Sequence, residues 1–182
     1  VVVREFLSGA MENTTARTFF EEMNMTAGQH QRENYEDIIA HELFHHWFGD
    51  LVTAESWSNL PLNESFATYG EYLWFEHKYG RMEADQHGFT DQSVYLAGKK
   101  SDLDLIRYHY SNREDMFDVV SYQKGGRILH MLRKTVGDEA FFRALNLYLT
   151  RYAYKTAEVH DLRLVFEEVT PLLAPPGPGQ RL

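Results

Sequence analysis

Two histidines placed four positions apart in one helical stretch constrain this chain more than any other feature. Residues 41–45 have the sequence His-Glu-Leu-Phe-His, inside a helical pattern that runs from about residue 35 to residue 48. Residues four apart share one face of a helix, with Cβ atoms about 5–6 Å apart. The imidazoles of His41 and His45 can therefore reach one metal ion at about 2.0–2.1 Å. Glu42 is too close in sequence to join them as a ligand, but it can reach a water held by the metal and act as a general base.

A third ligand is expected from a second helix. Glu64 follows His45 by 19 residues and lies in the next helical stretch, at about residues 62–79. Two histidines and one carboxylate leave one zinc position open, which is typical of catalytic zinc sites. Because these ligands and Zn²⁺ sum to a charge of about +1, the metal can lower the pKa of its water from about 15.7 towards about 7. The sequence therefore predicts one zinc ion per chain, held by His41, His45 and Glu64.

The composition is that of an acidic domain with enough apolar residues for a core. The chain has 182 residues, of which 43% are hydrophobic, and a formal net charge of −9. That charge argues against a nucleic-acid partner, since phosphate binding needs a basic face. The chain has no cysteine, which excludes disulfides and cysteine-based zinc sites. No apolar run approaches the length of a membrane span.

The periodicity predicts a mainly α fold with a small β remnant at the N-terminus. Strands are expected at residues 1–7 and 14–20. The helix at residues 35–48 is expected to stop at Gly49, and the helix at residues 62–79 at Gly80. Residues 1–170 are interpreted as a partial catalytic domain, and residues 171–182, rich in proline and glycine, as a disordered tail.

Four more helices are expected after Gly80. They lie at about residues 82–99, 119–136, 139–151 and 158–169. Gly88 is expected to interrupt the first, and Thr156 to cap the last. The pair Gly125-Gly126 weakens a helix and so indicates close packing at that point.

The histidines outside the metal motif are given no ligand role. His46 points about 100° away from His45 on the helix and is interpreted as lying behind the ligands or in the core. The other six show no ligand spacing, and they are His30, His77, His87, His109, His130 and His160.

Three separated motifs resemble those of the zinc aminopeptidases of the aminopeptidase N and leukotriene-hydrolase type. The sequence GAMEN at residues 9–13 is similar to the exopeptidase signature of that family. Residues 41–45 and Glu64 match its zinc motif at the family's spacing, and SYQKG at residues 121–125 is similar to the segment that holds its catalytic tyrosine. The resemblance runs from about residue 1 to residue 170. Two positions depart from the usual pattern, Ser65 in place of glycine and Pro61 in place of tryptophan.

The resemblance implies a thermolysin-like zinc peptidase core that removes the first residue of a peptide with a free N-terminus. It implies that Glu12 binds the substrate's α-amino group and that Tyr122 donates a hydrogen bond to the oxyanion. The implied substrate-binding segment comprises Gly9, Ala10, Met11, Glu12 and Asn13. Without the resemblance, the preferred interpretation is that Glu12 is a solvated acid and Tyr122 a packing residue.

Two alternatives stay open beside the aminopeptidase. One is a less selective zinc peptidase that also cuts internal bonds. The other is a zinc-binding piece with little or no catalysis, because the flanking domains carried by the family have no counterpart in this sequence. We expect this chain to bind zinc and to cleave poorly, since the parts that enclose the substrate are missing.

Overall fold

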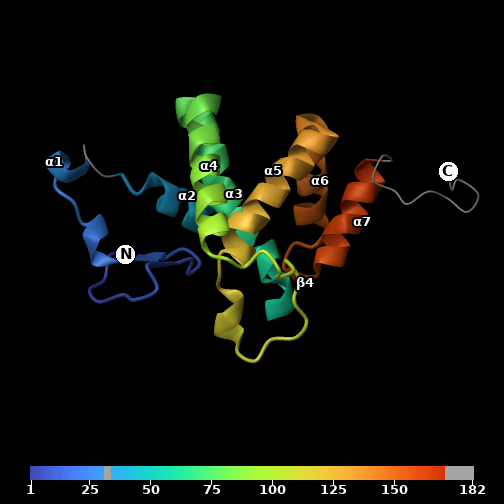
Figure 1. Ribbon diagram of the computed structural model, residues 1–182, viewed down its shortest axis with the longest axis horizontal. Coiled ribbons are helices and arrows are strands. Elements are labelled where there is room, and N and C mark those ends of the chain that lie inside the picture. The colour runs from blue at the N-terminus through green and yellow to red at the C-terminus, as the bar shows by residue number, and fades with distance from the viewer. Residues whose placement is uncertain (31–33, 171–182) are drawn as a thin grey trace, which may run out of the picture.

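A computed structural model describes residues 1–30 and 34–170, and most of them lie in helices (Figure 1). The predicted mainly α class is therefore confirmed. The tail predicted at residues 171–182 lies outside the described residues. None of the helices in the described part of the chain combines the length and the hydropathy needed to cross a membrane.

The N-terminal region contains a small hairpin rather than the two predicted strands. Strand β1 (Ala10–Met11) pairs antiparallel with β2 (Thr18–Phe19). The expected strand at residues 1–7 is wrong, because only Val2 forms a bridge, to Phe19, and the chain then turns through Glu5 at a φ of 53°. The expected strand at residues 14–20 is reduced to β2. A 3-10 turn, η1 (Glu21–Met23), and α1 (Ala27–His30) follow.

Helix α3 (Glu64–Tyr79) is the centre of the fold. It packs against α2 (Glu36–Phe44), α4 (Arg81–Ala97) and α5 (Gly125–Val136). Its buried side chains include Phe66, whose ring stacks on Phe48 at a centroid distance of 4.0 Å. The core continues to α6 (Asp138–Arg151) and α7 (Val159–Val169). Figure 1 shows α3, α4, α5 and α6 standing side by side, with the N-terminal hairpin extending away from them.

Several predicted boundaries need correction. Helix α2 ends at Phe44 instead of near Gly49, because the following amides of His46 and Trp47 bond to carbonyls three residues back. Helix α4 runs through Gly88 without interruption, and the space at that glycine is filled by the guanidinium of Arg127.

The junction before α7 also differs from the prediction. Thr156 does not cap the helix, since it lies in β4 (Lys155–Ala157), which pairs in parallel with β3 (Val52–Ala54). The carboxylate of Asp161 instead accepts a hydrogen bond from the backbone N–H of Glu158, at the start of α7. The β3–β4 pair joins the segment after α2 to the segment between α6 and α7. Local sequence patterns did not predict this contact.

Three short helical turns lead into α3 and α5. The 3-10 turn η2 (Trp57–Leu62) leads into α3, and the 3-10 turn η3 (Arg113–Met116) precedes η4 (Val120–Lys124), a π-helical turn. The predicted helix at residues 119–136 is therefore this π turn followed by α5. Its glycine pair packs closely, as expected, because a Cβ on Gly125 would lie 1.8 Å from Ser65 Oγ.

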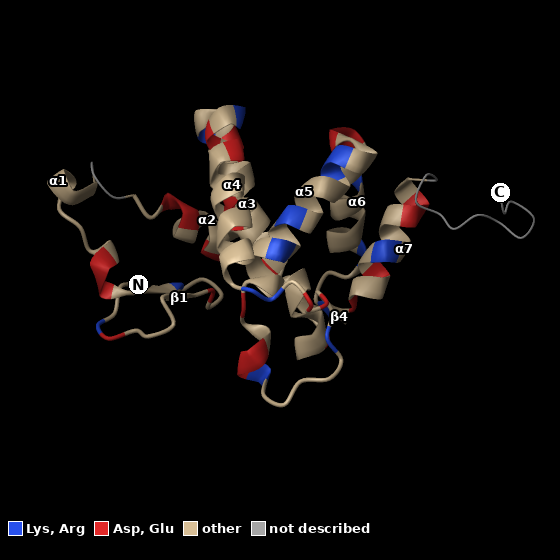
Figure 2. Ribbon diagram, viewed as in Figure 1, with Lys and Arg blue, Asp and Glu red and all other residues tan. Residues whose placement is uncertain are grey.

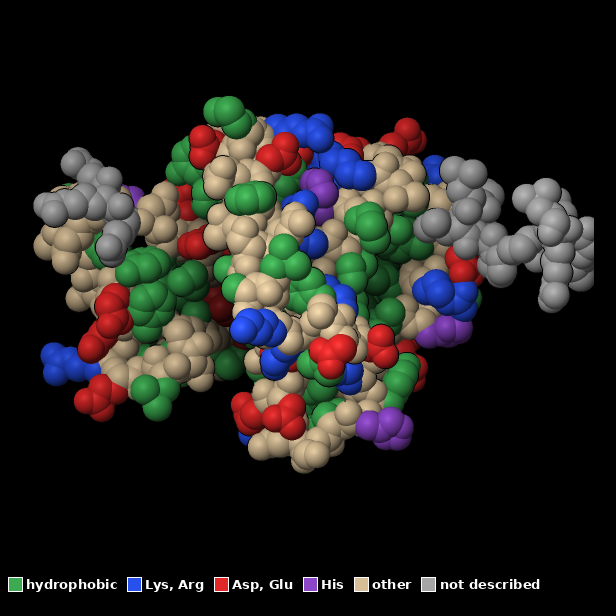
Figure 3. Space-filling model, viewed as in Figure 1, with side chains coloured by type: hydrophobic (Ala, Val, Ile, Leu, Met, Phe, Trp, Pro, Cys, Tyr) green, Lys and Arg blue, Asp and Glu red, His purple; other side chains and the backbone are tan. Residues whose placement is uncertain are grey.

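Charged residues are unevenly distributed over the helices. Lys and Arg residues form bands along α5, whereas acidic residues occupy the start of α2 (Figure 2). An apolar groove of about 350 Å³ lies between α5 and α7, and green side chains mark it in Figure 3.

Candidate metal centre

The three predicted ligand atoms meet at one point between α2 and α3. Nε2 of His41 lies 3.3 Å from Oε2 of Glu64, and Nε2 of His45 lies 3.4 Å from the same oxygen. All three atoms lie within 4.8 Å of one another. Two ligands of a tetrahedral zinc ion, each about 2.0–2.1 Å from the metal, are about 3.3–3.4 Å apart. The donor set and its spacing therefore fit zinc.

Both imidazoles are held from behind, so that Nε2 faces the site. Nδ1 of His45 is 2.9 Å from the backbone oxygen of Phe48, and Nδ1 of His41 is 2.8 Å from Oε1 of Glu71. A carbonyl or carboxylate oxygen only accepts, so each Nδ1 carries the proton. Each Nε2 is then the nitrogen that faces Glu64 and the metal position, where a bound metal would take the place of the Nε2 proton.

The electrostatics of the site favour a positive charge between the ligands. Burial alone would lower the pKa of His41, but the carboxylates of Glu64 and Glu71 raise it to about 10. Burial would raise the pKa of Glu64, but hydrogen bonds from both imidazoles lower it to about 2. Two buried carboxylates thus surround His41, and a metal cation supplies the charge that they attract.

Glu42 is the buried acid that the ligands leave free. Its side chain is 6% exposed, and its Oε2 has no hydrogen-bond partner among the described residues. Burial, together with the nearby charges of Glu12 and Glu64, raises the pKa of Glu42 to about 7, although His41 and His45 oppose the shift. A carboxylate with an unused oxygen beside the metal point is suited to accept a proton from water.

Tyr122 comes to the same site from the π turn. Its ring lies parallel to the ring of His41, at a centroid distance of 5.9 Å and an angle of 7°. Burial and then the charge of Glu64 raise the pKa of the phenol well above its ordinary range. Tyr122 therefore keeps its proton at neutral pH and can act as a hydrogen-bond donor.

The N-terminal hairpin brings residues 9–13 to the edge of the metal site. Strand β1 contacts α2, and the guanidinium of Arg17 donates to the backbone oxygen of Glu42 at 3.0 Å. Glu12 is half-buried, and its charge contributes to the pKa values of Glu42, His45 and Tyr122. The side chain of Asn13 donates to Thr18 Oγ1 at 3.1 Å and so braces the hairpin.

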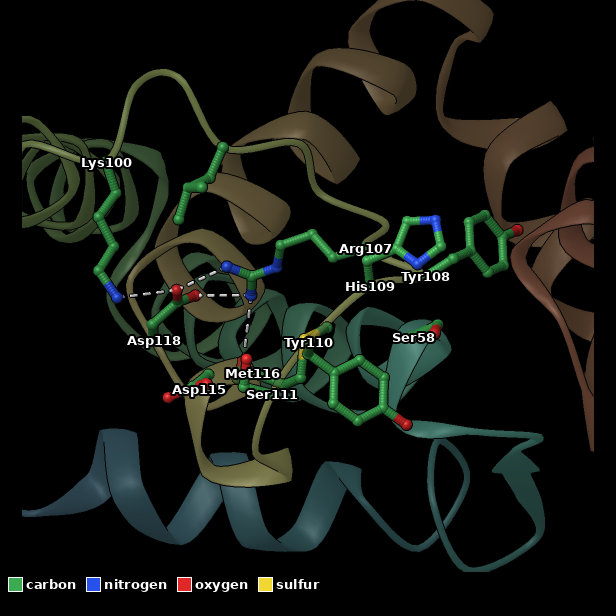
Figure 4. Close-up of a pocket in the computed structure, with 11 residues that line it drawn as sticks. Ser58, Lys100, Arg107, Tyr108, His109, Tyr110, Ser111, Asp115, Met116 and Asp118 are labelled. Atoms are coloured by element: carbon green, nitrogen blue, oxygen red, sulfur yellow. Dashed lines mark hydrogen bonds and ion pairs between the residues drawn. The ribbon is translucent and has the colours of Figure 1, made fainter.

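A cluster of charged residues holds the turn that carries Tyr122. Arg107 and Lys100 both bind Asp118, with nitrogen–oxygen distances of 2.7 Å and 3.0 Å, and they line an open cleft of about 850 Å³ (Figure 4). Asp118 Oδ1 in turn accepts from the backbone N–H groups of Val120 and Ser121. This cleft contains none of the metal-facing side chains, so we assign it a structural part in fixing the π turn.

Ser65, on α3, joins that helix to the same π turn. Its hydroxyl donates to the backbone oxygen of Ser121 at 2.7 Å, directly before Tyr122 in the chain. Sequence reasoning noted Ser65 only as a departure from the usual glycine. The bond depends on the π turn, which no local pattern predicted.

Sequence reasoning missed Glu71 and gave no role to His87. Glu71 accepts from His41 and also lies 2.9 Å from Nε2 of His87. Glu71 follows Glu64 by seven residues, two helical turns on the same face. That spacing was a usable signal for Glu71, whereas His87 lies on another helix and gave none. His46 stays outside the ligand set, with its Nδ1 4.0 Å from Asp50.

Comparison with known proteins places these features in one family. The family described as "Peptidase family M1 domain" matches residues 1–173. The chain is 34% identical over 180 residues to Aminopeptidase M1-D of Oryza sativa subsp. japonica, covering 93% of this chain and 20% of the relative. It is 38% identical over 173 residues to Probable aminopeptidase 1 of Saccharolobus solfataricus, covering 89% of this chain and 22% of the relative.

Solved structures show the same similarity. The M1 zinc metallopeptidase from Deinococcus radiodurans matches with a TM-score of 0.68 and 29% identity, covering 88% of this chain and 33% of that one. Yeast LTA4 hydrolase in complex with Bestatin matches with a TM-score of 0.80 and 26% identity, covering 90% and 27%. The chain spans about a fifth of the length of the curated relatives that it matches. With the family match extending over nearly all of its residues, the chain belongs to peptidase family M1.

Proposed function

We propose that this chain is the catalytic core of a zinc aminopeptidase, with a thermolysin-like arrangement formed by residues 1–170. His41, His45 and Glu64 hold the zinc, and the hydrolysed bond is the first peptide bond of a peptide with a free N-terminus. The observation that carries the proposal is the convergence of three ligand atoms within 4.8 Å of one another, with both Nε2 atoms 3.3–3.4 Å from Glu64 Oε2, together with the Oε2 of Glu42, which is unpartnered among the described residues. The relatives named as aminopeptidases support the same assignment.

Zinc, when bound, would polarise the scissile carbonyl and make a water acidic enough to attack at neutral pH. Glu42 takes the proton of the attacking water through its free Oε2 and returns it to the nitrogen of the leaving amine. Tyr122, protonated at neutral pH, donates a hydrogen bond to the oxygen on which negative charge develops. Glu71 and the Phe48 carbonyl hold the Nδ1 protons of His41 and His45 and so orient both rings, which would be neutral with zinc in place of the Nε2 proton.

Glu12 supplies the preference for a free N-terminus. It lies near Glu42 and Tyr122, and a carboxylate facing a substrate ammonium forms a charge-assisted hydrogen bond. The backbone of Gly9, Ala10 and Met11 is proposed to align the substrate as an added strand, with Asn13 bracing the loop. This edge of the site remains accessible, since Met11 is 38% exposed.

A panel of aminoacyl fluorogenic amides, each with its N-acetylated counterpart, tests the proposal. We expect hydrolysis of the free amines alone, and its loss on addition of a zinc chelator. Glu12→Gln is expected to reduce turnover of the free amines and to narrow their advantage over the acetylated forms. Chelator-resistant activity would remove the metal mechanism.

A less selective peptidase is the second candidate, and an open surface favours it. Leu43 and Trp47, beside the metal ligands in sequence, are 43% and 50% exposed, which leaves room for a chain that continues past its N-terminus. Equal cleavage of acetylated and free substrates would favour this alternative. Zinc binding without cleavage of acetylated or free substrates would favour the remaining alternative, a zinc-binding piece with little or no catalysis.

A further inference from the structure

A buried hydrogen-bonded chain extends from the metal point to a helix that carries no ligand. It begins at Nδ1 of His41, passes through both oxygens of Glu71 at 2.8 Å and 2.9 Å, and ends at Nε2 of His87 on α4. The side chains of these three residues are 12%, 15% and 16% exposed. Asp91 lies one turn further along α4, with its Oδ2 3.9 Å from Nε2 of His87.

The direction of these hydrogen bonds follows from the chemistry of the central group. An ionised carboxylate only accepts hydrogen bonds, so both histidines present an N–H to Glu71. Burial would raise the pKa of Glu71, but the hydrogen bonds from His41 and His87 outweigh it and lower that pKa. Each oxygen of Glu71 is thus fixed by a histidine from a different helix.

The position of His87 is itself fixed by packing. Its ring stacks on Phe75 of α3, with centroids 4.8 Å apart and an angle of 13°. A carboxylate held at one oxygen can rotate about its side chain, whereas one held at both oxygens keeps a single orientation. His87 therefore limits where Glu71 can point, and Glu71 fixes the ring orientation and tautomer of His41.

We propose that His87 is a positioning residue of the metal site, which raises zinc affinity by holding Glu71 against His41. The proposal rests on the proposed zinc site. It adds α4 to the elements that build that site and gives a role to a histidine without ligand spacing. Mutation of a residue that hydrogen-bonds to a metal-binding histidine typically lowers metal affinity by about 10–100-fold.

The test is a zinc titration of the full chain in competition with a chromophoric chelator. His87→Gln keeps an N–H donor at the same reach, while His87→Asn keeps polarity on a side chain too short to meet Glu71. We expect His87→Asn to weaken zinc binding about 10-fold or more. We expect the zinc affinity of His87→Gln to stay within about threefold of that of the unmodified chain, a much smaller change than in His87→Asn. His77→Asn, at an exposed position on α3, is the matched control and should leave the affinity unchanged.

A second comparison separates positioning from general packing. If His87 acts through Glu71, His87→Asn should add little further loss in a Glu71→Ala background, because the coupling between the two residues is already gone. Circular dichroism shows whether each variant is folded. Unchanged zinc affinity in folded His87→Asn, or an equal loss in both backgrounds, would overturn the inference. Failure of the unmodified chain to bind zinc would instead overturn the proposed zinc site.

Discussion

At the scale of single residues, the proposed chemistry depends on two groups outside the proposed ligand set. Glu42 presents a buried oxygen without a partner among the described residues. Tyr122 presents a protonated phenol beside His41. Each can be altered by a change of one atom or one group, with little change in volume.

Glu42→Gln replaces the proton acceptor by a neutral amide of the same shape. We expect zinc affinity to remain within a few-fold of the original and kcat to fall about 10²–10⁴-fold, the usual contribution of a general base. Steady-state kinetics and metal analysis of the same preparation check this. Near-normal turnover in the variant would remove Glu42 as the base.

Tyr122→Phe removes only the hydroxyl and keeps the ring parallel to His41. We expect kcat to fall about 10²–10³-fold with little change in KM, because an oxyanion donor acts mainly in the transition state. Tyr95→Phe, a tyrosine on α4, is a control and should leave kcat unchanged. A rise in KM with unchanged kcat would assign Tyr122 to substrate binding instead.

The proposed ligands can be picked out from the sequence because they follow a simple spacing rule. The His41–His45 spacing sets two rings on one helical face, and Glu64 begins the next long helix. The residues that hydrogen-bond behind the proposed ligands were harder to predict from the sequence. Glu71 shares a face with Glu64, but His87 reaches the site only through the packing of α4 on α3, which depends on tertiary structure.

At the scale of elements, α3 and the π turn determine how Tyr122 meets the metal ligands. Ser65 on α3 bonds to the Ser121 carbonyl, and Gly125 allows the two backbones to approach. On the other side, Asp118 fixes the start of the turn through Arg107 and Lys100. Both contacts can be tested without touching the metal ligands.

Gly125→Ala is expected to destabilise the fold by about 1–3 kcal/mol, since the new Cβ would lie 1.8 Å from Ser65 Oγ and the helices must separate. Gly126→Ala is the matched control, because its Cβ would meet Thr68 only at 3.2 Å, and its effect should be smaller. Ser65→Gly should recover much of the loss in Gly125→Ala. Chemical denaturation measures all four chains, and equal effects of the two alanine variants would contradict the close approach.

The Asp118 cluster predicts a specific acid sensitivity. Burial would raise the pKa of Asp118, but hydrogen bonds from Arg107 and Lys100 lower it from the ordinary 3.8 to about 2. A carboxylate with a lowered pKa in the folded state stabilises the protein above its unfolded pKa, and this contribution is lost as the pH falls towards 2. We therefore expect the free energy of unfolding to fall between about pH 4 and pH 2.

Asp118→Asn should flatten that part of the pH profile and lower stability at neutral pH by about 1.5–3 kcal/mol, the value of hydrogen bonds to a charged group. Denaturation curves at several pH values measure both effects. Asp102→Asn, at an exposed position, is the control. An unaltered acid limb in Asp118→Asn would show that other carboxylates cause the loss.

Sequence patterns predicted the long helices but not their junctions. Helices α3, α6 and α7 lie where expected, within one or two residues. The π turn, the early end of α2 and the β3–β4 pair depend on contacts between distant segments. The strand expected at residues 1–7 fails for a related reason, since β-branched residues there find only one bridge to Phe19.

At the scale of the whole molecule, a helical core brings together three segments that are far apart in sequence. The hairpin with Glu12, the α2–α3 pair with the metal ligands, and the π turn with Tyr122 meet around one point. The helical core that positions them is built on α3. The central claim is that this point is a zinc site.

Zinc retained after dialysis, measured in the unmodified chain and in two matched variants, tests that claim most directly. His45→Gln removes a ligand, whereas His46→Gln changes the adjacent histidine, which faces Asp50 instead of the ligands. We predict one zinc ion per chain in the unmodified protein and in His46→Gln, and little or none in folded His45→Gln. An unmodified chain without zinc, or full retention in His45→Gln, would contradict the site.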